Sequence, residues 1–250
     1  METKRQIKLN YTREFTIACK INNLKPIELL QYFINHVSFY AFIGGKIDVT
    51  YLWATTVCID FKEEYGGEII QVTIPEIQEI SLKYIKKLTS LNLNEPFLSS
   101  TAAFQSILIM DEWSSEMLPF TDYEPEIMIF NGELLKLTFD FNLICRMNGS
   151  GIEELLQYFI DKVSLARERA TNFHHFVKTD PSTAFLLLLV GHDESVRDRV
   201  LPQQEMYKKY GLRLLELDDE QNEEDNFENR MKNYDAFYQE WFSALNRISN

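Results

Sequence analysis

The sequence predicts an α+β fold. It consists of two related strand–turn–helix units with small, mostly antiparallel sheets, followed by a C-terminal amphipathic helix. Two observations support this prediction: an internal sequence repeat, and a hydrophobic pattern that changes from period two to helical spacing within each copy. The chain has 250 residues, and the predicted boundaries are 1–120 for the first unit, 126–217 for the second, and 218–250 for an acidic linker and the final helix.

The internal repeat relates residues 15–39 to residues 141–165. The two segments align without a gap at an offset of 126, and 12 of their 25 positions are identical. An offset of this size is too long for a solenoid repeat. It indicates two copies of a domain-sized unit.

Each copy begins with an alternating pattern. Apolar side chains alternate with more polar ones over residues 15–21 and again over residues 135–143, and this period of two is typical of a strand with one apolar face. After a short turn, the apolar residues of 29–37 and 155–163 recur at helical spacing. The repeated unit is therefore predicted to be a strand, a tight turn and an amphipathic helix.

The repeat also preserves polar residues that lie off the apolar side of the predicted helices. Glu28, Gln31, Tyr32 and Ser38 recur as Glu154, Gln157, Tyr158 and Ser164. Three interpretations remain open: the duplication is too recent for these positions to have changed, the two helices meet about a pseudo-two-fold axis through matched hydrogen bonds, or the copies carry equivalent ligand sites. The second interpretation predicts inter-repeat contacts at Gln31, Tyr32, Gln157 and Tyr158.

Turn and capping signals place the other elements of the first copy. Residues 49–61 are predicted to form a strand that pairs with residues 69–74 across a turn at Gly66-Gly67. Helices are predicted after Pro75 and after Ser100, where proline and serine suit the first turn and the cap of a helix.

The second copy begins after a predicted connector at residues 121–125. Asn131-Gly132 is the strongest short hairpin signal in the chain, and it predicts a turn between two short strands. Beyond the repeat, a long helix is predicted over residues 152–176 and a late strand over Gly211–Leu217. A weak echo of Ser100-Thr101-Ala102 occurs at Ser182-Thr183-Ala184, at a different offset of 82.

The C-terminal segment differs in composition from the rest. Residues 216–240 contain ten acidic and two basic side chains, a local charge of −8, and residues 216–225 are predicted to be a solvated linker. From Phe227 onward, apolar and aromatic residues recur at spacings of 4 and 3, which predicts a helix with a heptad seam. This helix either packs on its own domain or docks into a groove of a partner. The second alternative makes four aromatic residues candidates for partner binding: Tyr234, Tyr238, Trp241 and Phe242.

Charge and cysteine content limit the classes of function. The chain carries 25 Lys+Arg against 38 Asp+Glu, a net charge of −13, which argues against binding to nucleic acids or anionic membranes. The longest apolar run, residues 184–190, is too short for a membrane helix. Cys19, Cys58 and Cys145 lie among apolar residues without metal-ligand spacing, which predicts buried free thiols and a cytoplasmic protein.

Catalytic motifs are missing from the sequence, which has no glycine-rich phosphate loop, no GxSxG elbow and no HExxH helix. One group of titratable residues could converge on a metal ion: His174, His175, His192, Asp193 and Glu194. This group supports an alternative function, a metal-assisted hydrolase or a small-ligand enzyme. The favoured interpretation includes no metal and no cofactor.

The favoured function is that of a non-enzymatic cytoplasmic protein that binds another protein as an assembly component, an adaptor or an inhibitor. It is predicted to act through the aromatic C-terminal helix and an acidic surface. A partner with a basic surface fits this prediction, because complementary charge speeds the encounter of two proteins.

Overall fold

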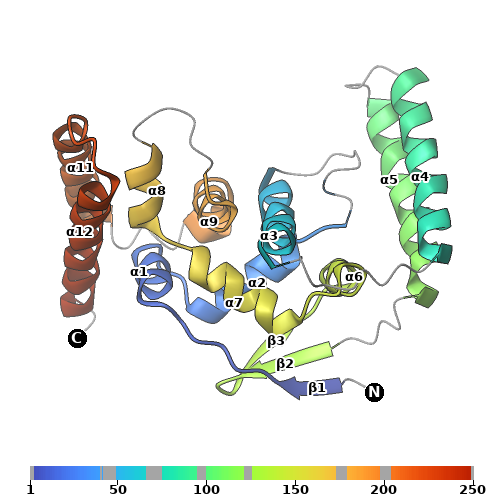
Figure 1. The fold of residues 1–250 in the computed structure, drawn as a ribbon, viewed down its shortest axis with the longest axis horizontal. Coiled ribbons are helices and arrows are strands. Elements are labelled where there is room, and N and C mark those ends of the chain that lie inside the picture. The colour runs from blue at the N-terminus through green and yellow to red at the C-terminus, as the bar shows by residue number, and fades with distance from the viewer. Residues whose placement is uncertain are drawn as a thin grey trace. The chain divides into compact units, whose positions relative to one another are not determined.

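The computed structural model describes residues 3–39, 41, 49–65, 75–94, 100–120, 126–172, 179–197 and 204–248. These residues form helices and one three-stranded sheet (Figure 1). The α-helices are α1 (Arg13–Ile21), α2 (Pro26–His36), α3 (Val49–Tyr65), α4 (Pro75–Asn94), α5 (Ser100–Met117), α6 (Phe139–Asn148), α7 (Ile152–Lys162), α8 (Leu165–Asn172), α9 (Pro181–His192), α10 (Glu194–Arg197), α11 (Gln204–Gln221) and α12 (Phe227–Ile248). The strands are β1 (Thr3–Gln6), β2 (Glu126–Phe130) and β3 (Glu133–Lys136), and Leu118–Phe120 forms the 3-10 helix η1.

The predicted α+β fold is wrong, because most of each segment predicted to open a copy as a strand is helical. Residues 15–21 lie in α1, and only the first two residues of 135–143 lie in β3 before α6 begins. Each repeated unit is therefore a helix, a turn and a helix. In α1, Ile17 and Cys19 are buried together with Ala18 between them. The buried side of α1 is broad enough to include residues two apart, while Arg13, Thr16 and Lys20 lie on its more exposed side. Such a helix can therefore imitate a period of two in its sequence.

The sequence does contain a signal that α1 and α6 are helices: a threonine that caps the start of each one. The alternating hydrophobic pattern obscured this signal. Thr12 Oγ1 accepts a hydrogen bond from the backbone N–H of Phe15 at 3.1 Å, and Thr138 Oγ1 accepts one from Phe141 at 3.2 Å. A threonine three residues before the first buried phenylalanine is an N-cap signal for a helix. It occurs at the same offset of 126 as the rest of the repeat.

Two further predicted strands are also helical. Residues 49–61 lie in α3, and Gly211–Leu217 lies in α11, which continues into the predicted acidic linker as far as Gln221. The proposed return strand and its glycine turn, residues 66–74, lie outside the described residues. The long helix predicted over residues 152–176 is divided into α7 and α8, and residues 173–176 again lie outside the described residues.

Other local predictions are confirmed. β2 and β3 pair antiparallel across Asn131-Gly132, whose φ angles of 49° and 83° are the positive values that this kind of two-residue turn requires. The helices expected after Pro75 and Ser100 are α4 and α5, and α12 is the expected C-terminal helix. The amphipathic helix of each copy is α2 or α7. The predicted connector at residues 121–125 lies outside the described residues.

The chain forms two compact units that are interleaved in sequence. Unit 1 contains residues 1–9 and 31–156, and unit 2 contains residues 10–30 and 157–250. The sequence-based boundaries divide the chain into consecutive segments instead. Each unit thus contains chain from both copies of the repeat, and α2 and α7 contribute to both units.

Unit 1 contains the sheet and the hairpin of helices α4 and α5. The strand order is β1-β2-β3, with β1 parallel and β3 antiparallel to the central β2. A hydrophobic cluster joins Tyr84 and Leu88 of α4 to Trp113 of α5 and Leu143 of α6. The rings of Tyr84 and Trp113 stack with their centroids 5.7 Å apart.

Unit 2 is organised around α12, which packs against α1, α8 and α11 (Figure 1). Arg230 of α12 is buried, and its Nε donates a hydrogen bond to the backbone oxygen of Ala170 at 2.9 Å. A cation at this position satisfies a carbonyl near the C-terminal end of α8. No helix in the described part of the chain combines the length and apolar character that crossing a bilayer requires.

Candidate partner-binding groove

Two glutamines related by the repeat bind backbone in the same way. In unit 1, Gln31 Oε1 accepts from the backbone N–H of Lys136 at 2.8 Å, and Gln31 Nε2 donates to the Lys136 oxygen at 2.9 Å. In unit 2, Gln157 makes the same pair of bonds with Asn10, again at 2.8 and 2.9 Å. Lys136 leads into the second copy and Asn10 into the first. Each glutamine therefore holds the chain that leads into the opposite copy.

Other contacts repeat this exchange between the copies. Thr138 Oγ1 donates to the backbone oxygen of Ile34 at 3.2 Å, and Thr12 Oγ1 donates to that of Ile160 at 3.5 Å. Edge-to-face aromatic pairs follow the same rule: Phe33 with Phe141 at 6.0 Å, and Phe15 with Phe159 at 6.2 Å between ring centroids. Of the preserved polar residues, Gln31 and Gln157 therefore have the same structural role in the two units.

A further matched pair identifies the counterpart of α9 in the first copy. Thr55 Oγ1 accepts from the backbone N–H of Ser38 at 3.0 Å, and Thr183 Oγ1 accepts from that of Ser164 at 2.9 Å. By this contact, α9 corresponds to α3 with an offset of 128. The weak sequence echo at an offset of 82 would make Thr101 the counterpart of Thr183. The matched hydrogen bonds instead make Thr55 its counterpart.

The two repeated tyrosines lie beside a basic side chain of their own helix. Tyr32 lies with its ring centroid 6.4 Å from that of His36. Tyr158 is buried, and Lys162 Nζ lies 5.0 Å from the centroid of its ring. The residue four positions after each tyrosine therefore contacts its ring, which is the usual spacing of helix neighbours.

The aromatic residues of α12 face the interior of unit 2. Tyr234, Tyr238 and Trp241 are 0%, 6% and 6% exposed, and Phe242 is partly buried. Burial raises the pKa of Tyr238 to about 12. Trp241 stacks on Tyr210 of α11, with 5.2 Å between centroids and 4° between planes. In this conformation these side chains form the core between helices, and they leave the outward side of α12 to charged and polar residues.

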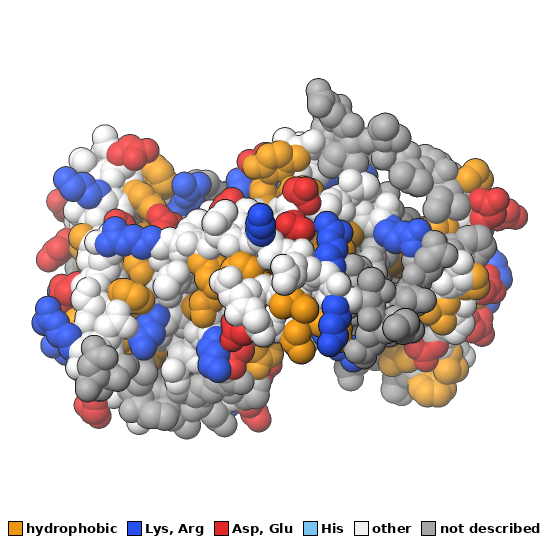
Figure 2. Space-filling model, turned by 90° about the horizontal axis from the view of Figure 1, so that it is seen from below, with side chains coloured by type: hydrophobic (Ala, Val, Ile, Leu, Met, Phe, Trp, Pro, Cys, Tyr) orange, Lys and Arg blue, Asp and Glu red, His pale blue; other side chains and the backbone are white. Residues whose placement is uncertain are grey.

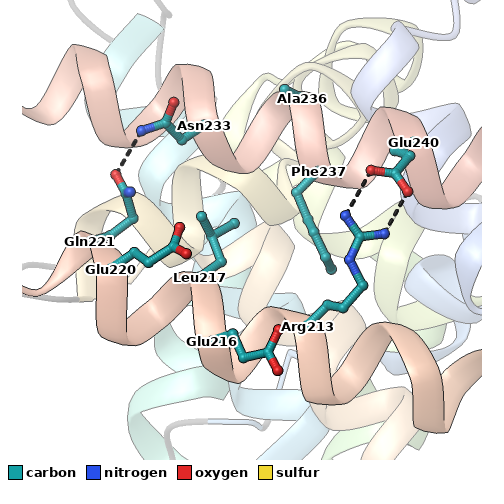
Figure 3. Close-up of a pocket in the computed structure, with 9 residues that line it drawn as sticks. All are labelled: Arg213, Glu216, Leu217, Glu220, Gln221, Asn233, Ala236, Phe237 and Glu240. Carbon is teal, nitrogen blue, oxygen red and sulfur yellow. Dashed lines mark hydrogen bonds and ion pairs between the residues drawn. The ribbon is translucent and has the colours of Figure 1, made fainter.

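A groove of about 530 Å³ lies between α11 and α12 (Figure 3). It is lined by Arg213, Glu216, Leu217, Glu220, Gln221, Asn233, Ala236, Phe237 and Glu240. The apolar lining residues come from both helices, while Glu216 and Glu220 stand one helical turn apart on α11. The groove thus combines a partly apolar wall with carboxylates.

One carboxylate of the groove is already neutralised. Arg213 binds Glu240 through both terminal guanidinium nitrogens, Nη1 and Nη2, with Nη2 2.8 Å from Oε2. Tyr210 Oη also donates to Glu240 at 3.2 Å. The hydrogen bonds from Arg213 are the main reason that the pKa of Glu240 is held below its usual value. Glu216 and Glu220 have no ion-pair or hydrogen-bond partner among the described residues.

The groove also contains a pair of side-chain amides. Asn233 Nδ2 donates to Gln221 Oε1 at 2.9 Å, and Gln221 is only 7% exposed. This bond leaves Gln221 Nε2 as a donor and Asn233 Oδ1 as an acceptor without partners in the described part of the chain. Figure 3 shows the two side chains bridging α11 and α12 at one end of the groove.

The histidine-based metal site receives no support from the described residues. His174 and His175 lie outside them. His192 is exposed at the end of α9, Asp193 caps that helix, and Glu194 is exposed with Arg197 3.6 Å away. No group of three or more His, Cys, Asp or Glu side chains in the described ranges could hold a metal ion.

Exposed apolar side chains also occur on α4 and α5. Leu82, Leu93, Phe104, Ile107 and Leu108 are between 45% and 81% exposed. On the face drawn in Figure 2, hydrophobic side chains reach the surface between interspersed acidic and basic ones. Phe104, Ile107 and Leu108 lie three and four residues apart and therefore share one side of α5.

Sequence reasoning identified the acidic segment but not the groove. It assigned residues 216–225 to a linker, whereas Glu216 and Glu220 belong to α11 and share one wall. The recurrence of Tyr210, Leu214 and Leu217 at spacings of four and three was the available signal for a helix. No family model matches the chain, and comparisons with curated proteins and with solved structures find no similar protein.

Proposed function

We propose that this protein is a non-enzymatic, cytoplasmic protein that binds another protein with a basic surface, as an assembly component, an adaptor or an inhibitor. The binding surface is the acidic side of the α11–α12 hairpin, not the aromatic side of α12. The aromatic side chains of α12 are buried and hold α12 against α11. This packing leaves the acidic residues of both helices on the outside, which supports the assignment.

The groove between α11 and α12 is the observation that carries the proposal. Glu216 and Glu220, which have no partner among the residues that the structure describes, lie beside the apolar side chains of Leu217 and Phe237. A basic side chain has an apolar stem and a charged end, and such a site complements both parts. The local charge of −8 over residues 216–240 adds a longer-range attraction for a basic partner.

The cytoplasmic location is supported by the cysteines. Cys19, Cys58 and Cys145 are all free and buried. Burial raises the pKa of Cys145 to about 12, which keeps its thiol protonated and unreactive at neutral pH. Buried free thiols are typical of proteins from reducing compartments.

Affinity capture from the source cells tests the proposal. The bait is the full chain, compared with Glu216→Gln/Glu220→Gln and with a control of equal charge change, Glu76→Gln/Glu79→Gln on α4. We expect a partner with a basic surface to be retained by the wild type and the control, and lost with the groove variant. Retention of the same proteins by all three baits would contradict the proposed surface.

A further inference from the structure

We infer that the end of the α4–α5 hairpin where α4 passes into α5 is a surface at which two copies of this chain associate (Figure 1). This surface, called here the uncharged end, comprises residues 88–94 of α4 and 100–110 of α5. A comparison of α4–α5 with the equivalent hairpin of unit 2 supports the inference, which is independent of the proposed function.

The hairpins α4–α5 and α11–α12 are equivalent parts of the two copies. Residues 78–88 and 204–214 are related by the same offset of 126 as the internal repeat, and five of their 11 positions are identical. The dipeptide Glu112-Trp113 recurs as Glu240-Trp241 at an offset of 128, which is also the offset between α3 and α9. The duplication therefore extends through both hairpins.

Both hairpins contain the same aromatic stack. Tyr84 of α4 stacks on Trp113 of α5, with 5.7 Å between ring centroids and 8° between planes. Tyr210 of α11 stacks on Trp241 of α12, with 5.2 Å and 4°. The tyrosines are 126 positions apart and the tryptophans 128, so the contact agrees with the sequence alignment.

An ion pair that joins the two helices also recurs. Lys87 Nζ of α4 lies 2.7 Å from Glu112 Oε2 of α5. At the equivalent positions of unit 2, Arg213 Nη2 of α11 lies 2.8 Å from Glu240 Oε2 of α12. Because both the stack and the ion pair are matched, the two hairpins can be compared position by position.

The two hairpins differ in charge at the end where their helices connect. Residues 88–94 and 100–110 contain no charged side chain, whereas the equivalent residues 214–220 and 228–238 contain eight. The α11–α12 hairpin shows that this end of the fold accommodates charged residues. Folding therefore does not explain why α4–α5 has none there.

Four apolar side chains are exposed at the uncharged end, by 81%, 62%, 45% and 46%: Leu93, Phe104, Ile107 and Leu108. The Lys87–Glu112 ion pair sets the register of the two antiparallel helices. It places Leu93 level with Ser106, so all four side chains lie near the same end of the hairpin. This end thus combines exposed apolar side chains with an absence of charge.

A second copy of this chain is the partner that suits such a surface. In a symmetric dimer, groups near the two-fold axis meet their own copies, so a charged residue there would meet a like charge. The uncharged end avoids this repulsion, whereas the chain as a whole carries a net charge of −13 and repels another copy. A membrane surface suits it less, because helices that lie on membranes are rich in Lys and Arg beside their apolar side.

The exposed apolar area indicates weak association. Four side chains of this size expose together on the order of 400 Å², which is about half of what one partner contributes to a standard interface. We therefore expect a dimer that forms at micromolar concentrations and dissociates on dilution.

Sedimentation velocity of the full chain, over concentrations on both sides of the micromolar range, tests the inference. We expect a reversible monomer–dimer equilibrium that added salt does not weaken, because salt screens the repulsion between the two copies. In NMR spectra of the same samples, the backbone signals that change with concentration should lie in residues 88–94 and 100–110. A protein that is monomeric throughout, or a dimer whose changes lie elsewhere, would overturn the inference.

Residues taken from unit 2 provide the matched variant. Leu93→Asp/Phe104→Lys introduces the residues that unit 2 has at the equivalent positions, Asp219 and Lys232. Since α11–α12 contains them, circular dichroism and the melting temperature of the monomer should change little. Dimerisation should weaken at least about tenfold, because association would bury the new charges. An unchanged dimer affinity would contradict the proposed surface.

Exposed leucines of α11 provide the control. Leu212 and Leu215 are 57% and 60% exposed, and Leu212→Lys/Leu215→Asp makes the same net charge change. Its dimer affinity should stay within about twofold of the wild type, and equal effects of the two double variants would overturn the inference. Flotation with phosphatidylcholine vesicles distinguishes the other occupant. A monomeric chain that floats with vesicles, and loses this binding in Leu93→Asp/Phe104→Lys, would assign the surface to lipid.

Discussion

At the scale of single residues, a glutamine side chain makes the backbone hydrogen bonds that a neighbouring strand would otherwise make. Gln31 satisfies both backbone groups of Lys136 at the end of β3, and Gln157 does the same for Asn10. A glutamine can do this because its amide has the same donor and acceptor as a peptide group. Sequence comparison of the two copies identified both glutamines as special, but their partners could not be predicted, because a backbone partner carries no residue-type signal.

Gln31→Leu should destabilise the protein by about 1–2 kcal/mol, because it leaves the N–H and C=O of Lys136 without their partner. Gln157→Leu is the matched variant in unit 2 and should cost a similar amount. Urea unfolding followed by circular dichroism measures both. A loss below about 0.5 kcal/mol, the range of ordinary surface substitutions, would show that water replaces the glutamine without cost.

A second residue-scale prediction concerns the buried carboxyl group of Asp140. Burial raises its pKa, and the hydrogen bond from Ser38 Oγ at 2.9 Å opposes that effect. Because the native carboxyl then holds its proton more tightly than the unfolded one, stability should fall as pH rises from the unfolded pKa of about 3.9 through the native value. Asp140→Asn should remove this part of the pH dependence. Ser38→Ala should extend it to higher pH, and urea midpoints across the acid range measure both changes.

At the scale of elements, the position of α12 decides what its aromatic residues do. Trp241 is almost fully buried against Tyr207 and Tyr210, so Trp241→Ala should destabilise unit 2 by about 3–5 kcal/mol. Phe242→Ala, at a partly exposed position of the same helix, should cost less than half as much. Thermal unfolding of the two variants measures the difference. Equal losses would mean that Trp241 is not part of the core.

The sequence predicts elements well where a single local signal decides them. Asn131-Gly132 defines a turn and Pro75 begins a helix, because both depend on backbone preferences of a few residues. Prediction fails for α1 and α3, whose buried sides are broad. Phe15, Ile17 and Cys19 alternate as they would in a strand, and only the cap at Thr12 distinguishes the helix. The groove was out of reach because it required α11 to be recognised as one helix, whereas its residues were assigned to a late strand over 211–217 and an acidic linker over 216–225.

At the scale of the whole molecule, each unit depends on both halves of the chain. Unit 1 pairs β1 with β2, and unit 2 packs α1 against α12. Residues 1–122 and 123–250, produced together as two separate polypeptides with a tag on one, should therefore purify as a 1:1 complex. Size-exclusion chromatography with light scattering measures this. Two independent, folded fragments would contradict the interleaved arrangement.

The same interleaving determines the order of events on the ribosome. α1 ends at Ile21, whereas α12, which packs against it in unit 2, begins only at Phe227 and is therefore synthesised much later. At the usual rates of translation, this delay is roughly 10–45 s. During that time the side of α1 that packs against α12 has no final partner. Nascent chains of this protein are therefore expected to need a chaperone until α12 has been synthesised.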